Sequence, residues 1–402
     1  MIHKHLSDRV NSLSESATLL MTRRSRELKE AGYDIINLSI GEPDFDTPHC
    51  VKEAAIEAIH NNITHYSPVA GFNELRKAVA AKLKRENDLD YSFGQIVVSG
   101  GAKQSIANSL ICLVNPGDEV MIPAPFWVSY PEMVKLADGK SVIIPSTIEQ
   151  DFKVTADQVE KHMTDKSKVF IFSSPSNPSG SVFTKGELEA IAKVLAKKED
   201  LYIISDEIYE QINFNGKHES IAQFDFIKDR VITINGVSKG FAMTGWRIGY
   251  SASNKAIAEA CNTLQGQYTS GASSISQMAA LKALQANPSE LKEMQVMKQQ
   301  FRERRDLLLQ LLGNVRGMKT NVPDGAFYVF PEISWYFGKS DGKTQIANDT
   351  DLCLYLLDKA HVALVPGSAF GCENHIRFSY ACSTGEIHES VRRIKEALEA
   401  LC

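Results

Sequence analysis

Several polar residues of this sequence follow short apolar runs and could do chemistry on a small ligand. Lys239 comes shortly after the run 231-VITIN-235. A lysine partly removed from water has a lowered pKa and becomes a nucleophilic amine, which forms Schiff bases with aldehydes. Ser238 and Arg247 could hold an anionic group beside it, since the planar fork of an arginine suits phosphate. An exposed loop lysine is the alternative interpretation, because most lysines lie at the surface.

A carboxylate follows another apolar run. Asp206 comes directly after 201-LYIIS-205 and is therefore expected at the carboxyl end of a sheet, where open α/β folds place their ligands. A buried carboxylate is costly unless it meets a positive group or hydrogen-bond donors. A helix N-cap is an equal alternative for Asp206. Tyr209, three residues on, could face the same cavity or belong to the core.

Two loops add groups that could hold a phosphate and orient a ligand. In 99-SGGAKQSIANSL-110, Gly101, Ala102 and Lys103 form a glycine turn and a helix start, whose N–H groups can bind phosphate. A tight turn with nothing bound stays open, and the spacing fits neither the dinucleotide fingerprint nor the P-loop. In 173-SSPSNPSG-180, Asn177 offers a donor and an acceptor, and Asn177-Pro178 is a candidate cis bond.

These parts together fit one ligand. They call for an aldehyde, a ring that needs a carboxylate partner, and a phosphate. Pyridoxal 5'-phosphate (PLP) has all three, and the pairing of a Schiff-base lysine with an acidic partner at the pyridine nitrogen is typical of PLP sites.

Composition narrows the class of protein. The chain has 402 residues and a net charge of −5, which argues against a broad basic surface for nucleic acid or anionic lipid. No uncharged run approaches the roughly 20 residues that span a bilayer. The seven cysteines are scattered without a C-x-x-C, so we expect no disulfide framework and no metal site. A cytoplasmic protein is expected.

The elements that must position these residues are short strands separated by helices. Helical spacing over residues 51–59 predicts a helix, with Thr47-Pro48 as its cap and first-turn proline. Alternating strands and helices predict an α/β fold with a seven-stranded, mostly parallel sheet. The predicted strands are 95–99, 119–123, 141–145, 168–173, 201–205, 231–235 and 247–252.

The pattern changes after about residue 290. A long charged helix over 290–312 is followed by predicted strands at 326–330, 361–366 and 375–380. A last helix has a plausible capping box in Ser383 and Glu386. We therefore predict two domains. The large domain comprises residues 49–290, and the small α+β domain comprises residues 1–48 with 291–402.

At this point the sequence resembles the class I/II PLP-dependent aminotransferases of fold type I, and within them the bacterial aspartate aminotransferase subgroup. The resemblance covers nearly the whole chain, and six ordered motifs carry it. They are 65-HYSPVAGFNELRKAVA-80, 125-PFWVSYPEM-133, 174-SPSNPSG-180, 205-SDEIYE-210, 238-SKGFAMTGWRIGY-250 and 377-RFSYA-381.

The resemblance implies a role for each matching residue. Lys239 is implied to form the Schiff base and to move the proton, Asp206 to pair with the pyridine nitrogen, and Tyr209 with Asn177 to donate to a ring oxygen. The remaining implied cofactor contacts are Gly101, Ala102, Lys103, Ser238 and Arg247 around the phosphate, Trp127 on the ring, and Tyr66 from the neighbouring subunit. The implied substrate contacts are Arg377 on the α-carboxylate, assisted by Gly41, Asn177 and Trp127.

Some positions depart from the commonest pattern of the family. Lys103 stands where many relatives carry hydroxyl residues, and it could serve the phosphate, the side-chain carboxylate of a dicarboxylic substrate, or both. Ser16 and Thr18 are candidate contacts in an N-terminal segment that closes over substrate in relatives, where an inward Glu15 would repel an acidic substrate.

The expected activity is a ping-pong transfer of an amino group between an L-amino acid, aspartate or glutamate, and a 2-oxo acid such as 2-oxoglutarate. The expected assembly is a homodimer with shared sites. A carbon–sulfur lyase or an aromatic or prephenate aminotransferase on the same fold stays open. A non-enzymatic PLP-binding regulator is disfavoured, because only about 30 residues precede the matching region. A nicotinamide-dependent dehydrogenase lacks its glycine fingerprint.

Overall fold

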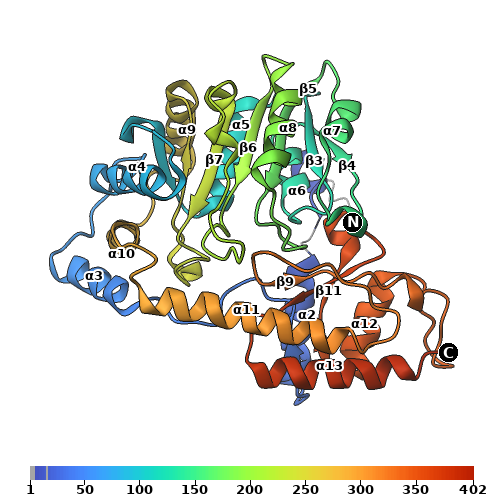
Figure 1. Ribbon diagram of the computed structural model, residues 1–402. Coiled ribbons are helices and arrows are strands. Elements are labelled where there is room, and N and C mark those ends of the chain that lie inside the picture. The colour runs from blue at the N-terminus through green and yellow to red at the C-terminus, as the bar shows by residue number, and fades with distance from the viewer. Residues whose placement is uncertain (1–4, 15–16) are drawn as a thin grey trace.

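A seven-stranded sheet forms the centre of the molecule (Figure 1). The computed structural model describes residues 5–14 and 17–402. The strand order is β2-β8-β7-β6-β5-β3-β4, and β8 alone runs antiparallel to its neighbours. The strands are β2 (Ile96–Ser99), β3 (Glu119–Pro123), β4 (Lys140–Ile144), β5 (Ser167–Ser173), β6 (Tyr202–Asp206), β7 (Val231–Gly236) and β8 (Gly249–Ala252).

The predicted α/β class and the seven-stranded, mostly parallel sheet are confirmed. Six strands begin and end within one residue of their predicted bounds. The exception is β8, which begins at Gly249 although a strand was predicted from residue 247. Arg247 has a left-handed backbone (φ 57°) at the end of the 3-10 turn Thr244–Trp246, so it cannot continue a strand.

Helices cover both faces of this sheet because its strands are apolar on both faces. Neighbouring residues of β6 show this, since Ile203 packs into one hydrophobic core and Ile204 into the other. The first core is shared with α3 (His49–His60), α4 (Asn73–Asn87), α7 (Ala156–His162), α8 (Lys185–Ala196) and α10 (Ser274–Gln285). The second core is shared with α5 (Ala102–Leu113), α6 (Tyr130–Leu136) and α9 (Lys255–Tyr268).

The predicted cap of α3 is wrong in its details. The helix begins at His49 with Pro48 as its N-cap residue, and no side chain caps it. The Thr47 hydroxyl instead donates to the carbonyl of Ala242 at 2.8 Å and accepts from Trp246 Nε1 at 3.0 Å. A tertiary contact with the segment that follows Lys239 has replaced the local cap.

A second group of elements packs below the sheet in Figure 1, along the long helix α11 (Lys292–Leu312). An antiparallel sheet has the order β11-β12-β9, and β1 near the N-terminus pairs in parallel with β10. The strands are β1 (Ile36–Asn37), β9 (Tyr328–Val329), β10 (Val362–Ala363), β11 (Val365–Pro366) and β12 (Ile376–Ser379). The other helices are α1 (Asp8–Asn11), α2 (Ala17–Glu30), α12 (Asp349–Lys359) and α13 (Thr384–Glu399).

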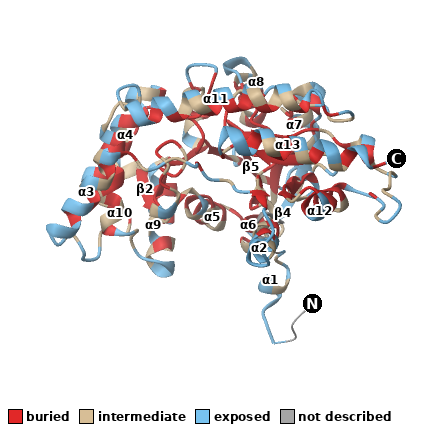
Figure 2. Cartoon of the chain, turned by 90° about the horizontal axis from the view of Figure 1, so that it is seen from below, coloured by how far each residue is buried: buried red, intermediate tan, exposed pale blue. Residues whose placement is uncertain are grey.

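Local sequence signals explain several ends of these elements. Ser383 and Glu386 form the predicted capping box at the start of α13. Buried and exposed residues alternate along α11 and α13, as amphipathic helices require (Figure 2). The Asn177-Pro178 bond is cis, as predicted. Among the described helices, none combines the length and the apolar character that crossing a bilayer requires.

Candidate active site

A cavity of about 350 Å³ lies at the carboxyl ends of the central strands, between the large sheet and β12. Four of its lining side chains are cationic and one is a carboxylate. The cations are Lys103, Lys239, Arg247 and Arg377, and the carboxylate is Asp206. This excess of positive charge indicates a ligand with several negative charges.

Lys239 follows β7 and reaches back into the cavity. Its Nζ donates to the carbonyl oxygen of Gly41 at 2.5 Å and lies 6.0 Å from the centre of the Tyr209 ring. Burial lowers the pKa of Lys239 to about 8, against the opposing charge of Glu42 and with the help of Arg247 and Arg377. The side chain therefore loses its proton around pH 8, well below the usual range for a lysine, and the neutral form is the nucleophile.

Asp206 is the last residue of β6 and is buried. One carboxylate oxygen accepts from the Tyr130 hydroxyl at 2.7 Å, and the other accepts from the amide of Ile208 at 3.3 Å. Burial raises the pKa of Asp206 to about 6, although these two donors oppose the shift. No described lysine or arginine forms an ion pair with this carboxylate, so it is available to a cationic partner.

Tyr209 lies one turn beyond Asp206. Its hydroxyl is hydrogen-bonded to the Tyr328 hydroxyl at 2.8 Å. Burial, with Tyr328 beside it, raises the pKa of Tyr209 well above its usual value. The hydroxyl therefore stays protonated and can donate to a ligand oxygen.

The start of α5 forms a cradle for an anion. Ala102 is the first helical residue, and Gly101 before it has a left-handed backbone (φ 95°). A Cβ on Gly101 would lie only 2.3 Å from Nη2 of Arg247, so a side chain there would displace the guanidinium. Arg247 itself donates to the carbonyls of Thr244 and Gly100 at 3.0 and 3.2 Å. The start of α5 at Ala102, the guanidinium of Arg247 and Ser238 thus line the same part of the cavity, where they could bind an anion.

Lys103 extends from the same helix start towards Trp127. Its Nζ lies 5.0 Å from the centre of the Trp127 ring, within reach of a cation–π contact. Burial against the cavity wall and the charge of Arg247 lower the pKa of Lys103, although part of its side chain stays exposed. No described acid pairs with it.

Arg377 on β12 is a buried cation, and no acidic residue in the described part of the chain pairs with it. Its Nη1 donates to Oδ1 of Asn177 at 2.9 Å, and its Nη2 donates to the carbonyl of Ser39 at 2.6 Å. The guanidinium lies 4.5 Å from the centre of the Tyr328 ring, and Nε has no partner within the described residues. A buried charge without a counterion is costly. The arrangement fits a site in which the carboxylate of a ligand neutralises the guanidinium.

Most of the predicted site residues meet in this cavity. Gly101 adjoins it through Arg247, while Tyr66 lies outside it with its side chain almost fully exposed (98%). The implied contact of Tyr66 therefore has no counterpart within one chain and stays a prediction. Glu15 and Ser16 lie outside the described residues, and the side chain of Thr18 is not described.

Among the lining residues that sequence reasoning missed, three have side-chain contacts that shape the site. Tyr130 holds Asp206, Tyr328 meets both Tyr209 and Arg377, and Thr244 donates to Glu42 Oε2 at 2.8 Å. Tyr130 lies inside the quoted motif 125–133 and Tyr328 inside a predicted strand. An aromatic residue in either setting reads as core, and only the fold shows which hydroxyl faces the cavity.

A larger cavity, of about 480 Å³, lies behind the segment that carries Asp206 and Tyr209. Its carboxylates Glu86 and Glu210 are already paired with Lys82. It contains neither Lys239 nor Arg377 in its lining, so the smaller cavity is the better candidate for an active site.

Comparisons with known proteins agree with this choice. The sequence model of the aminotransferase class I and II family matches residues 33–394. A relative from Petunia hybrida, a bifunctional aspartate aminotransferase and glutamate/aspartate-prephenate aminotransferase, is 50% identical over 98% of this chain and 82% of its own length. A probable aspartate/prephenate aminotransferase from Rhizobium leguminosarum is 46% identical over 97% of this chain and 98% of its own.

Solved structures of aspartate aminotransferases also resemble this chain. The aspartate aminotransferase from Rhizobium meliloti has a TM-score of 0.95 and 39% identity, and the match covers all of both chains. The aspartate aminotransferase from Thermus thermophilus with maleate has a TM-score of 0.92 and 37% identity, over 98% of this chain and all of that one. The chain therefore belongs to the class I and II aminotransferases, enzymes that transfer an amino group between an amino acid and a 2-oxo acid.

Proposed function

We propose that this chain is a PLP-dependent aminotransferase that takes aspartate or glutamate as donor and a 2-oxo acid such as 2-oxoglutarate as acceptor. The excess of cations in the cavity carries the proposal. A cofactor phosphate and the two carboxylates of a dicarboxylic substrate supply the negative charge that these cations need.

The donor set of the cavity fits PLP. The cradle of Gly101, Ala102 and Arg247 suits a phosphate, because a Cβ at Gly101 would fill it. The unpaired carboxylate of Asp206 suits a protonated pyridine nitrogen. Lys239, whose pKa is lowered to about 8, suits an aldehyde.

When bound, PLP supplies an aldehyde carbon that bonds to amines and a pyridine ring that accepts an electron pair. Lys239 is then the base that removes the proton of the substrate α-carbon and later returns a proton, a role worth about 10²–10⁴-fold. Asp206 keeps the ring nitrogen protonated, and Tyr209 with Asn177 donates to the ring oxygen. Trp127 would lie against the ring, and Ser238 would help to hold the phosphate, since both line the cavity.

Substrate carboxylates are assigned to the remaining cations. Arg377 takes the α-carboxylate in a bidentate pair, with Asn177 and Gly41 at its edge. Lys103 takes the side-chain carboxylate, because it lines the cavity and is not paired with an acid. The Thermus thermophilus relative was solved with maleate, a dicarboxylate, which supports this assignment.

We also propose a homodimer in which Tyr66 reaches the phosphate of the partner's site. The support is that Tyr66 is exposed on its own chain and lies in a motif that resembles the family's.

A panel of amino donors with 2-oxoglutarate tests the proposed specificity. Aspartate should be the best donor to 2-oxoglutarate. Glutamate needs a different acceptor, because its own product is 2-oxoglutarate, and it should be an equally good donor to oxaloacetate. Prephenate belongs in the panel as an acceptor, because relatives carry that activity in their names. Release of pyruvate from cystathionine without any acceptor would instead support a carbon–sulfur lyase.

A further inference from the structure

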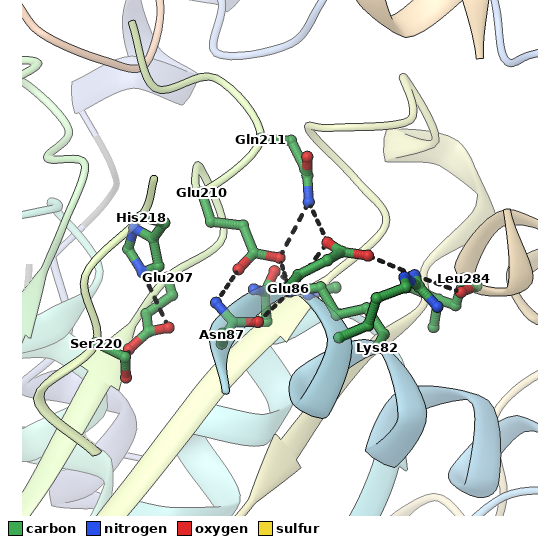
Figure 3. A network of polar contacts seen from close by, with 12 residues as sticks. Lys82, Glu86, Asn87, Glu207, Glu210, Gln211, His218, Ser220 and Leu284 are labelled. Atoms are coloured by element: carbon green, nitrogen blue, oxygen red, sulfur yellow. Dashed lines mark hydrogen bonds and ion pairs between the residues drawn. The ribbon is translucent and has the colours of Figure 1, made fainter. Parts of the chain in front are cut away.

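The segment 206–211, which begins at the last residue of β6, has side chains on two sides. Asp206 and Tyr209 line the cavity, whereas Glu207 and Glu210 carry their carboxylates into a polar network outside its lining. Figure 3 shows this network between the segment, the end of α4 and the loop around His218. The proposed mechanism uses none of its members.

The first part of the network joins the segment to α4. Lys82 is only 2% exposed, and its Nζ contacts the Glu210 carboxylate and donates to Oδ1 of Asn87 at 2.9 Å. The Asn87 amide donates to the other Glu210 oxygen at 3.0 Å. Burial acts to raise the pKa of Glu210, but Lys82, His218 and Asn87 together hold it below its usual value, so the carboxylate stays charged.

The second part joins the segment to the loop that follows it. One oxygen of Glu207 accepts from the hydroxyls of Ser205 and Ser220 at 2.8 and 2.6 Å. The other lies 3.0 Å from Nε2 of His218. Burial acts to lower the pKa of His218, but the charges of Glu207 and Glu210 raise it above its usual value. Two buried cations thus balance two buried carboxylates when His218 is protonated.

Buried charges are not a general requirement for the stability of a fold. Removing an ion from water costs several kcal/mol, and apolar side chains of similar volume often replace a buried pair without loss of stability. A buried pair does fix the orientation of its two side chains, because any other orientation leaves a buried charge unpaired. Since Glu207 and Glu210 share the segment with Asp206 and Tyr209, fixing the first two residues also fixes the other two.

A bound metal ion is a weaker explanation of the same residues. Ligand atoms of Glu207, Glu210 and His218 lie within 4.8 Å of one another. The ammonium of Lys82, however, already contacts Glu210 and provides the positive charge that a cation would bring.

We propose that the buried pairs Lys82–Glu210 and His218–Glu207 are positioning residues, which hold Asp206 and Tyr209 where they meet the cofactor and are not required for the stability of the fold. The inference rests on the proposed function and deepens it. The test therefore begins with PLP binding by the unchanged protein, because failure of that step would contradict the proposed function and not the network.

The informative variant is Lys82→Met with Glu210→Met, which removes both charges at once. Glu86, which also lies 3.7 Å from Lys82, keeps its ion pair with Arg85 at 2.5 Å. A second variant, Glu207→Gln with His218→Gln, removes the other pair and keeps hydrogen-bonding groups. The control is a more exposed ion pair, changed by Lys198→Met with Asp200→Asn. This double variant removes a contact of 3.0 Å at the opposite, amino end of β6.

For both network variants we expect thermal unfolding within a few degrees of the parent and a rise of about tenfold in the PLP dissociation constant, as expected when one hydrogen bond to a charged group is misaligned. In the PLP-free protein, the amides of residues 207–211 should exchange hydrogen faster. The control should leave the PLP dissociation constant and the hydrogen exchange of residues 207–211 unchanged.

Parental PLP affinity and parental exchange in both network variants would overturn the proposal. So would the failure of either variant to fold, since the pair would then be needed for the fold itself.

Discussion

At the scale of single residues, two cations of the cavity, Lys239 and Arg377, have different proposed partners. Lys239 is assigned to the cofactor, and Arg377 is assigned to the substrate carboxylate. The assignment of Arg377 predicts weaker substrate binding when it is removed. The assignment of Lys239 predicts how PLP capture depends on pH.

Arg377→Ala should raise KM for the amino donor by about 30-fold or more, while PLP stays bound. The reason is that a buried bidentate contact to a carboxylate is worth about 2–5 kcal/mol. Arg377 donates to Asn177 and Ser39, and none of its hydrogen bonds within the described residues reaches the phosphate cradle. Steady-state kinetics and a PLP titration measure the two effects separately. Loss of PLP with an unchanged KM would contradict the assignment.

The lowered pKa of Lys239 predicts how fast the PLP-free protein captures PLP at different pH. Only the neutral amine attacks an aldehyde, so the capture rate should rise about tenfold from pH 7 to pH 9 and level off above pH 8. A lysine with an ordinary pKa of about 10.4 would give a rise of about a hundredfold with no plateau in this range. Stopped-flow absorbance distinguishes the two curves.

At the scale of elements, the start of α5 is the feature that the phosphate is proposed to use. Gly101→Ala should raise the dissociation constant of PLP by more than tenfold, because its Cβ would displace Arg247. Gly117→Ala is the matched control, since Gly117 has nearly the same φ (94°) and nothing within 4 Å of its Cβ position. Both variants should lose stability from backbone strain, about 1–3 kcal/mol each, because both glycines have a positive φ. Equal PLP affinity in the two variants would refute the cradle.

The elements also show what the sequence could predict. Runs rich in Val and Ile located the buried strands closely, because a strand apolar on both faces has few other interpretations. The late start of β8 and the uncapped α3 depend on the tertiary positions of Arg247 and Thr47, which no local pattern records.

The site divides in the same way. Lys239, Asp206 and Asn177 follow apolar strands and could be placed at one sheet edge from the sequence. The sequence could not predict that Arg377 contacts Asn177 and Ser39, since these contacts join positions that are 200 and 338 residues apart.

At the scale of the whole molecule, two predictions concern organisation. The division into a large domain of residues 49–290 and a small domain of residues 1–48 with 291–402 stays a prediction. The proposed homodimer can be tested through its shared sites.

Mixing two inactive or weakened variants tests this sharing. Tyr66→Ala should weaken PLP binding at both sites of its dimer, and Lys239→Ala should abolish capture through the amine. In a hybrid dimer, one site combines an intact Lys239 with an intact Tyr66 of the partner, so parental PLP affinity should return at up to half of the sites. A monomeric protein, or a mixture that binds PLP no better than its components, would contradict the shared site.

The most direct test of the central claim is a half-reaction. Addition of aspartate, without acceptor, to the PLP-loaded protein should release one 2-oxo acid per active site and remove the visible absorption of bound PLP, and 2-oxoglutarate should restore it. Lys239→Ala should show neither change. Release of 2-oxo acid well beyond one per site without acceptor, or an unchanged spectrum in the parent protein, would contradict the account.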